Sequence, residues 1–77
     1  MSAADYAPIQ RLDHEPQGRY TPPEDRVAAL RDALRGVEVG SHDERIIRWL
    51  AGWDDSTVRT VVSLIERARR NPSRATH

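Results

Sequence analysis

Residues 41–70 read SHDERIIRWLAGWDDSTVRTVVSLIERARR, and this stretch predicts two amphipathic helices joined by a short turn. A helix turns by 100° per residue, which puts the large apolar residues of the first half on one arc of about 160°. They are Ile46, Ile47, Trp49, Leu50 and Trp53. The apolar residues of the second half also share one side, and they are Val58, Val61, Val62, Leu64, Ile65 and Ala68. We expect both sets to face a small core.

Capping and stop signals mark the bounds of these two helices. Ser41-His-Asp-Glu44 has the pattern of a capping box, and Gly52 is a natural end. Asp54 or Asp55 caps the next helix, and Asn71-Pro72 stops it. The expected helices therefore cover residues 42–51 and 55–70.

An earlier helix is predicted over residues 22–35. Thr21-Pro22-Pro23-Glu24 supplies a capping threonine, prolines in the first turn and a glutamate three residues after the cap. Val27, Leu30 and Leu34 then lie within an arc of about 60°. Gly36 is the expected stop, because a residue with positive φ after a helix favours glycine. The fold class is all-α: a small three-helix bundle over residues 21–71, whose second and third helices are helix-turn-helix-like.

The ends of the chain are expected to be loose. Residues 1–20 contain two prolines, a glycine and scattered charges without helical or strand period, which predicts a flexible, extended, acidic N-terminal arm. The alternative is that Tyr6, Ile9 and Leu12 dock onto the helical body. Residues 72–77 are expected to form a disordered tail.

Composition and charge limit the class of protein. With 77 residues, no cysteine and no long apolar run, the chain is expected to be a single cytoplasmic domain that does not enter a membrane. The net charge of zero divides into −3 over residues 1–25, −1 over 26–55 and +4 over 56–77. Whether the acidic arm folds over the basic last helix is left open.

Catalysis and metal binding require side chains that converge, and the sequence offers no such motif. His14, His42 and His77 are far apart, so no helical pair of histidines is present. The acidic pairs Asp43-Glu44 and Asp54-Asp55 occupy capping positions. We expect a protein that is not an enzyme and has no metal or cofactor.

The polar side of the last helix favours DNA binding. Ala51-Gly52-Trp53-Asp54 fits the turn of a helix-turn-helix unit, and the helix after it would read the major groove of double-stranded DNA. Hydroxyl and guanidinium groups bind phosphates and base edges. The candidate DNA-binding residues are Thr57, Arg59, Thr60, Ser63, Arg67 and Arg70.

The two tryptophans favour a second hypothesis. Trp49 and Trp53 share the side of the helix that carries Ile46 and Leu50, which by itself indicates core packing. Two indoles are bulky for so thin a core, however, and tryptophan is a preferred anchor of protein interfaces. The chain could thus be a protein-interaction module or a homodimer that uses Trp49 and Trp53. The sequence identifies neither the partner nor the oligomeric state.

Residues 43–69 resemble a group of short uncharacterised proteins of actinobacteria and their phages that have a Trp-Leu-Ala-x-Trp-Asp core. An arginine-only set of basic residues agrees with such an origin. The same stretch is more faintly similar to helix-turn-helix families, from which Arg48, Asp54 and Asp55 depart. Neither resemblance implies site residues for this chain.

Overall fold

The computed structural model describes residues 1–70, and this part of the chain is folded into helices without any strand. The helices are α1 (Ala3–Tyr6), α2 (Pro23–Ala33), α3 (Ser41–Ala51) and α4 (Asp55–Arg70). The all-α prediction and the three long helices are confirmed. The predicted tail over 72–77 and the stop at Asn71-Pro72 lie outside the described residues. No helix within residues 1–70 has the length and apolar character needed to cross a bilayer.

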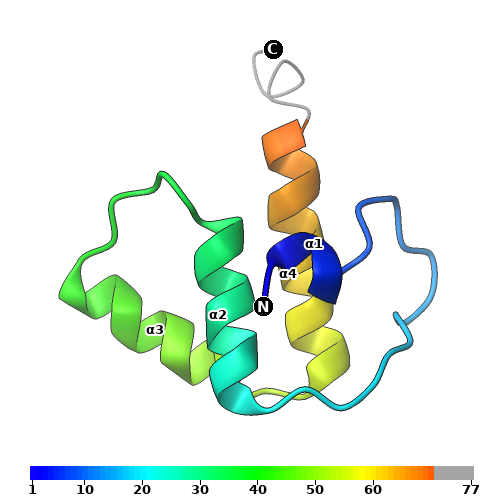
Figure 1. Ribbon diagram of the computed structural model, residues 1–77, viewed down its shortest axis with the longest axis horizontal. Helices are drawn as coiled ribbons and strands as arrows, with labels where there is room; N and C mark the ends of the chain where they lie inside the picture. The colour runs from blue at the N-terminus through cyan, green and yellow to red at the C-terminus, as the bar shows by residue number, and fades with distance from the viewer. Residues whose placement is uncertain (71–77) are drawn as a thin grey trace.

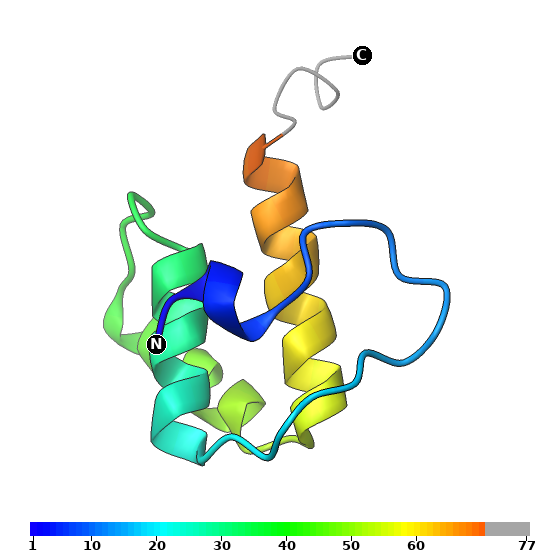
Figure 2. The ribbon, with the colours of Figure 1, turned by 45° about the vertical axis from the view of Figure 1, so that its right-hand side comes forward.

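α2 is the central element of the fold. It stands between α3 and α4, and α1 crosses in front of α4 (Figure 1). α2 packs against each of the other three helices, and α1 also packs against α4. From residue 8 to residue 22 the chain runs as a wide loop along the α4 side of the molecule (Figure 2).

Two of the predicted caps differ from those observed. α2 begins after Pro22, and the residue expected to cap it, Thr21, is buried and donates its backbone N–H to Asp55 instead. In α3 the glutamate of the expected capping box has no capping role. The backbone N–H of Gly40 donates instead to Asp43 at 3.0 Å, one residue earlier. Asp43 stands three residues after Gly40, and Glu44 stands three residues after Ser41. The sequence pattern therefore fits either acid, and only the backbone geometry selects between them.

The other signals behave as expected. Asp54 precedes α4 and accepts the hydroxyls of Ser56 and Thr57, each at 2.7 Å. Gly36 has a φ of +86°, a conformation that costs glycine little and other residues more. α2 ends at Ala33, before this turn.

The N-terminal segment is the main difference from the expected architecture. Ala3, Tyr6 and Ala7 are buried members of the core, whereas Ile9 is 45% exposed. Of the three residues considered for docking, Tyr6 docks fully. Small alanines let α1 approach α2 and α4 closely, and Tyr6 is its one large buried side chain. A helix of four residues has too few positions to show a period, so periodicity alone could not find it.

The core is thin, and much of it is alanine. The remaining buried hydrophobic residues come from the three long helices and are Ala29, Leu30, Ala33, Ile47, Ala51, Val58 and Val62. Leu30 is the largest side chain among the fully buried ones. A core of small residues brings the helix axes close together and leaves little room for further large side chains.

The expectation that the whole apolar side of α3 faces the core is wrong. Ile47 and Ala51 are buried against α2, but Ile46 is 45%, Trp49 61% and Trp53 49% exposed. α3 has one main neighbour, α2. One helix covers a narrower stripe than the arc of about 160° that the apolar residues occupy. The rest of the arc is left in solvent.

Candidate functional site

The side of α4 chosen for DNA binding does not form one accessible surface. Thr57 and Arg70 are exposed, and Thr60 and Arg67 are half-buried. Ser63 is fully buried and Arg59 is only 6% exposed. Ser63 and Arg59, two of the residues predicted to contact DNA, are therefore not accessible to a ligand in this fold. The cause is the N-terminal segment, which packs over the polar side of α4 in place of solvent.

Arg59 is held inside the fold by the N-terminal segment. Its Nε donates to the carbonyl oxygen of Tyr6 at 2.9 Å, and its Nη2 donates to that of Arg19 at 3.1 Å. The guanidinium lies 4.5 Å from the centre of the Tyr6 ring, a favourable cation–π distance. Gly18 also lies against this group: a Cβ there would come within 2.6 Å of Arg59 Cζ. The guanidinium thus ties three parts of the segment to α4.

Asp55 is the acidic partner in the same cluster. It accepts the Tyr6 hydroxyl and the Thr21 N–H, each at 2.7 Å, and lies 3.5 Å from Arg26 and 3.9 Å from Arg59. Partial burial acts to raise the pKa of the Asp55 carboxyl. The two hydrogen bonds and the two arginines outweigh that effect and hold the pKa below its usual range.

Two further members complete the cluster. Burial and the hydrogen bond to Asp55 raise the pKa of the Tyr6 hydroxyl, which therefore stays protonated and donates. Arg26 is 5% exposed and donates to the carbonyl oxygens of Ala51 and Thr21, each at 2.8 Å. The cluster connects the N-terminal segment with α2, α4 and the end of α3. Its polar groups satisfy one another, so its role is structural.

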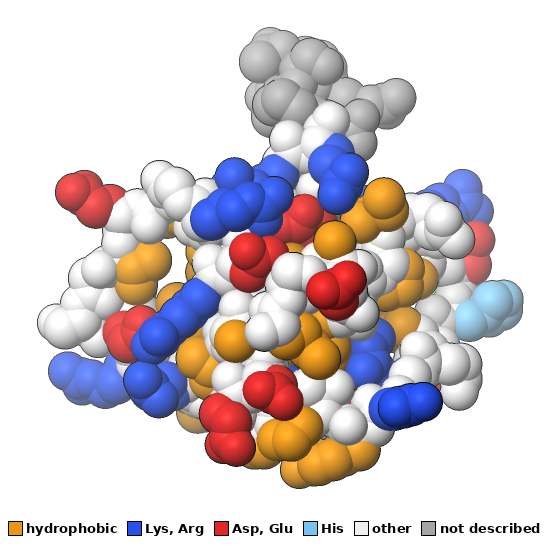
Figure 3. Space-filling view, viewed as in Figure 1, with side chains coloured by type: hydrophobic (Ala, Val, Ile, Leu, Met, Phe, Trp, Pro, Cys, Tyr) orange, Lys and Arg blue, Asp and Glu red, His pale blue; other side chains and the backbone are white. Residues whose placement is uncertain are grey.

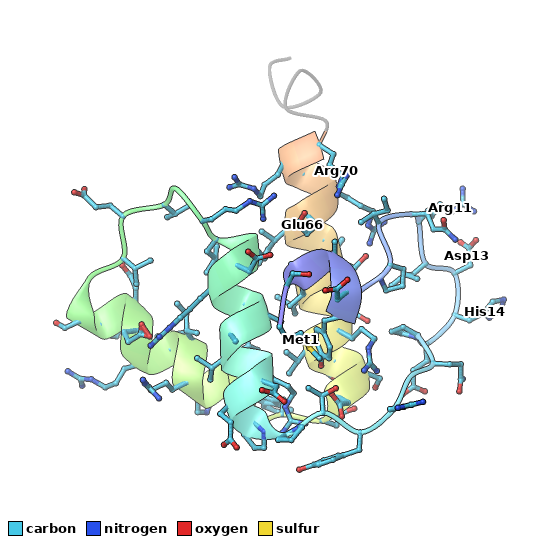
Figure 4. The ribbon with its side chains drawn as sticks, viewed as in Figure 1. Met1, Arg11, Asp13, His14, Glu66 and Arg70 are labelled. Atoms are coloured by element: carbon cyan, nitrogen blue, oxygen red, sulfur yellow. The ribbon has the colours of Figure 1, made fainter. Side chains whose placement is uncertain are left out.

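A second charge cluster lies near the C-terminal end of α4. Glu66 is 1% exposed and accepts from Arg35 at 2.7 Å, while Arg70 lies 3.8 Å away (Figure 4). Arginine side chains gather at this end of α4 with acidic side chains between them (Figure 3). Arg70 and Arg35 therefore act as partners of a buried carboxylate. Ser63 Oγ, one turn before Glu66, is buried without a hydrogen-bond partner among the described residues.

The exposed apolar side of α3 is the feature that packing within the chain does not explain. We call Ile46, Trp49, Leu50 and Trp53 the tryptophan face. The two indoles meet edge to face, with ring centres 5.7 Å apart and planes at 82°. Leu50 is half-buried and links the face to the core. The spacing 46, 49, 50, 53 is that of one side of a helix.

An apolar groove continues the tryptophan face toward α4. It has a volume of about 450 Å³, and α2, α3, α4 and the 37–39 connector all contribute to it. Its aliphatic lining consists of Leu30, Leu34, Val37, Val39, Ile46, Ile47, Leu50 and Ile65. Val37 and Val39 are 53% and 40% exposed. We call this feature the α3–α4 groove.

Charges of opposite sign lie on the two sides of this apolar surface. Glu38 and Asp43 line the α3–α4 groove. On the other side of α3, Arg45 and Arg48 are exposed, and neither is paired with any of the residues described. Arg45 lies one turn before Trp49. Arg45 therefore borders the tryptophan face beside Trp49, Arg48 lies about 100° around α3 from Trp49, and the two acids lie beside the groove.

A second depression lies away from the α3–α4 groove. The depression between residues 12–16 and the start of α4 has a volume of about 570 Å³ and is open. Asp13 and His14 lie on the outside of the loop there (Figure 4). Within residues 1–70 no three His, Cys, Asp or Glu side chains are grouped so as to hold a metal ion.

Comparison with protein-family models, with curated proteins and with solved structures finds no match to this chain. The resemblance of residues 43–69 to short actinobacterial and phage proteins therefore stays a prediction.

Proposed function

We propose that this chain is a non-catalytic protein-interaction module whose binding surface is the tryptophan face together with the α3–α4 groove. The observation that carries the proposal is the exposure of Trp49 in α3 and of Trp53 just after the end of α3, 61% and 49%, with their rings in edge-to-face contact. Between them the indoles expose roughly 250 Å² of largely apolar surface. With Ile46, Val37 and Val39 the patch reaches a few hundred Å², a size that often marks an interaction site.

Residue types at the surface support the same proposal. Tryptophan and arginine are the side chains that most often dominate binding energy at protein interfaces. Here Arg45, Arg48 and Trp49 lie on α3, and Trp53 follows two residues after its end. The alternative, a DNA-binding regulator, has less support, because Arg59 and Ser63 are buried and Arg70 neighbours a buried glutamate.

Site-specific photo-cross-linking in the cells that produce the protein tests the proposal. Benzoylphenylalanine replaces Trp49 or Trp53 in separate chains. Tyr20 is the matched control, because it is an aromatic residue that is 75% exposed on the loop before α2, where its ring lies beside Arg26 and outside the tryptophan face. We expect a discrete adduct from the two α3 positions and none from position 20. The purified partner should bind the wild-type chain and not the Trp49→Ala/Trp53→Ala variant.

Two outcomes would contradict this function. One is equal cross-linking at positions 20, 49 and 53, which would indicate non-specific contact. The other is binding to a labelled random DNA duplex that weakens steeply with salt and is reduced by Arg67→Ala/Arg70→Ala. Such behaviour would indicate phosphate neutralisation and would restore the DNA-binding hypothesis.

A further inference from the structure

The orientation of α3 relative to α4 is set at the turn that joins them. The two helices diverge from residues 52–54 on either side of α2 (Figure 1), and α3 packs mainly against α2. The tryptophan face ends in this turn, because Trp53 lies between the last residue of α3 and the first residue of α4. The setting of the indoles and the width of the α3–α4 groove therefore depend on how the turn is held.

A series of mostly buried polar contacts joins this turn to the N-terminal end of the chain. The Tyr6 hydroxyl donates to the Asp55 carboxylate at 2.7 Å, and this carboxylate lies 3.5 Å from the Arg26 guanidinium. Arg26 donates at 2.8 Å to the carbonyl oxygen of Ala51, the last residue of α3. We call these four residues the polar relay. It leads from α1 through α4 and α2 to the end of α3.

Little water competes with the contacts of the polar relay. Tyr6 and Arg26 are each 5% exposed, and the Asp55 side chain is 17% exposed. A hydrogen bond to a charged group is strong in such a place, and the loss of one partner leaves the others incompletely satisfied. Removal of the Tyr6 hydroxyl therefore exposes Asp55 to water and weakens its attraction for Arg26.

The other contacts of the N-terminal end lie farther from the turn. The backbone N–H of Ala3 donates to Asp32, near the end of α2. The carbonyl oxygen of Tyr6 accepts from Arg59, one turn into α4. The hydroxyl of Tyr6 is thus the group through which residues 1–7 act on the end of α3.

Residues 1–7, which we call the strap, can be released while the long helices stay folded. α1 has four residues, and the loop over residues 8–22 joins it to α2 (Figure 2). Apart from Tyr6, the buried side chains of the strap are the small ones of Ala3 and Ala7. Segments with few buried apolar contacts open at a lower free energy than a whole domain. The strap therefore opens before α2, α3 and α4 separate.

Building on the proposed function, we infer that docking of the strap controls the tryptophan face through the polar relay. With Tyr6 docked, the turn is held and α3 keeps the orientation in which the α3–α4 groove is open and the indoles meet edge to face. Release of Tyr6 loosens the turn, and α3 then moves relative to α4. Partner binding is thereby weakened, and by linkage a bound partner stabilises the docked strap.

Spin labels on the two sides of the groove test this movement directly. The chain has no cysteine, so His42→Cys and Ala68→Cys, both at exposed positions, take one label each. Double electron–electron resonance then reports the distance between the start of α3 and the last turns of α4. Tyr6→Phe keeps the ring and removes only the hydroxyl. We expect it to shift or broaden this distance distribution.

Asp55→Asn closes a double-mutant cycle. It should change the same distance distribution, because it breaks the polar relay at its next member. If the two residues act in series, Tyr6→Phe adds nothing further in a chain that already carries Asp55→Asn. All variants are compared under conditions in which circular dichroism shows that the helices are formed.

The indoles provide a second measurement. The sequence contains two tryptophans, so their side-chain N–H groups give two signals in a nitrogen–proton correlation spectrum. We expect both signals to move in Tyr6→Phe. Glu66→Gln is the matched control, because it also removes a buried carboxylate bound by an arginine, at the far end of α4. It should lower stability but leave the indole signals and the distance distribution unchanged.

Photo-cross-linking connects the movement to binding. In cells, Tyr6→Phe should lower the yield of adduct from positions 49 and 53 about fivefold, a typical size for coupling between two sites. An unchanged yield would overturn the control of binding by the strap, even if α3 moves.

The remaining outcomes separate this inference from the proposed function. Unchanged indole signals and distances in both relay variants would overturn the strap and leave the interaction module intact. Equal changes in Glu66→Gln would also overturn it, since any loss of stability would then move α3. A relay that moves α3 in a chain without any cross-link at positions 49 and 53 would overturn the proposed function instead.

Discussion

At the scale of single residues, the most informative position is Arg59. In the sequence it belongs to a polar side of α4 that matches a recognition helix, but in the fold its guanidinium binds the carbonyl oxygens of Tyr6 and Arg19. The polar pattern of α4 alone does not distinguish an arginine that contacts DNA from one that binds its own chain. The nearby Asp55 was a hint, since an acid four residues before an arginine on the same side favours a pair within the chain.

Replacing Asp55 tests the importance of this cluster. Asp55→Asn keeps the shape of the side chain but removes the charge that faces Arg26 and Arg59. We expect the free energy of unfolding to fall by about 2 kcal/mol, because a charged acceptor of two hydrogen bonds is lost in a partly buried place. Urea unfolding followed by circular dichroism measures it.

The neighbouring residue provides the matched control. Asp54→Asn should lower the free energy of unfolding much less than Asp55→Asn does, because asparagine caps a helix as well as aspartate does. An equal loss of unfolding free energy in the two variants would mean that Asp55 stabilises the start of α4 only through its negative charge, as any acid there would.

The lowered pKa of Asp55 also predicts how stability depends on pH. The folded-state pKa lies below the unfolded value of about 4, so the unfolded chain takes up the proton first as the pH falls. The stability from this group is therefore complete above the unfolded pKa and disappears as the pH falls through the folded pKa. The pKa of Asp54 is lowered too, by hydrogen bonds from Thr57 and Ser56, so it acts in the same window.

Asp55→Asn should remove its share of this dependence. Urea titrations between neutral and acidic pH should show a smaller loss of unfolding free energy in this variant than in the wild type. Parallel curves for the two proteins would show that Asp55 has the same pKa in the folded and unfolded chains.

At the scale of elements, α3 combines two sides with different roles. Ile47 and Ala51 attach it to α2, while Ile46, Trp49 and Trp53 remain in solvent. One part of the wide apolar arc thus packs against α2, and the other part forms an exposed surface. The period of a pattern gives the direction of the apolar side, but the neighbours decide how much of it is covered.

Truncations on α3 should separate these two sides. Ile47→Ala should lower the free energy of unfolding by about 2–4 kcal/mol, because it leaves a cavity against α2. Trp49→Ala should cost less than about 1 kcal/mol, mostly the edge-to-face contact with Trp53. Urea unfolding measures both. A larger loss in the tryptophan variant than in the isoleucine variant would mean that the indole is part of the core.

At the scale of the whole molecule, the N-terminal segment completes a small domain. A chain of this size buries a small fraction of its surface on folding, so three short helices alone would have a low free energy of unfolding. Tyr6, Ala3 and Ala7 add a further layer over α2 and α4, and the charge cluster holds it in place. The acidic arm does fold back onto the basic helix, but short buried contacts hold it, so salt should screen the association only weakly.

Deleting residues 1–7 tests this role. We expect the midpoint of thermal unfolding to fall by about 10 °C or more, because a loss of about 2 kcal/mol is large for a domain of this size. Ile9→Ala is the control, since Ile9 is half-exposed just beyond the docked part, and it should change the midpoint by less than about 3 °C. A deletion variant as stable as the wild type would show that the segment does not dock in solution.

The sequence by itself determined the helical class, the three long helices, the capping aspartate before α4 and the glycine with positive φ. Each of these depends on residues within a few positions of one another, so local spacing and backbone preference suffice. Only the tertiary structure decided which sides of the helices are buried. That choice depends on α1 covering Arg59 and Ser63, and on α3 having α2 as its one main neighbour. Contacts between distant segments leave no period in the sequence, and for this reason the sequence left Trp49 and Trp53 open between core packing and an interface, and only the folded chain shows that they are exposed.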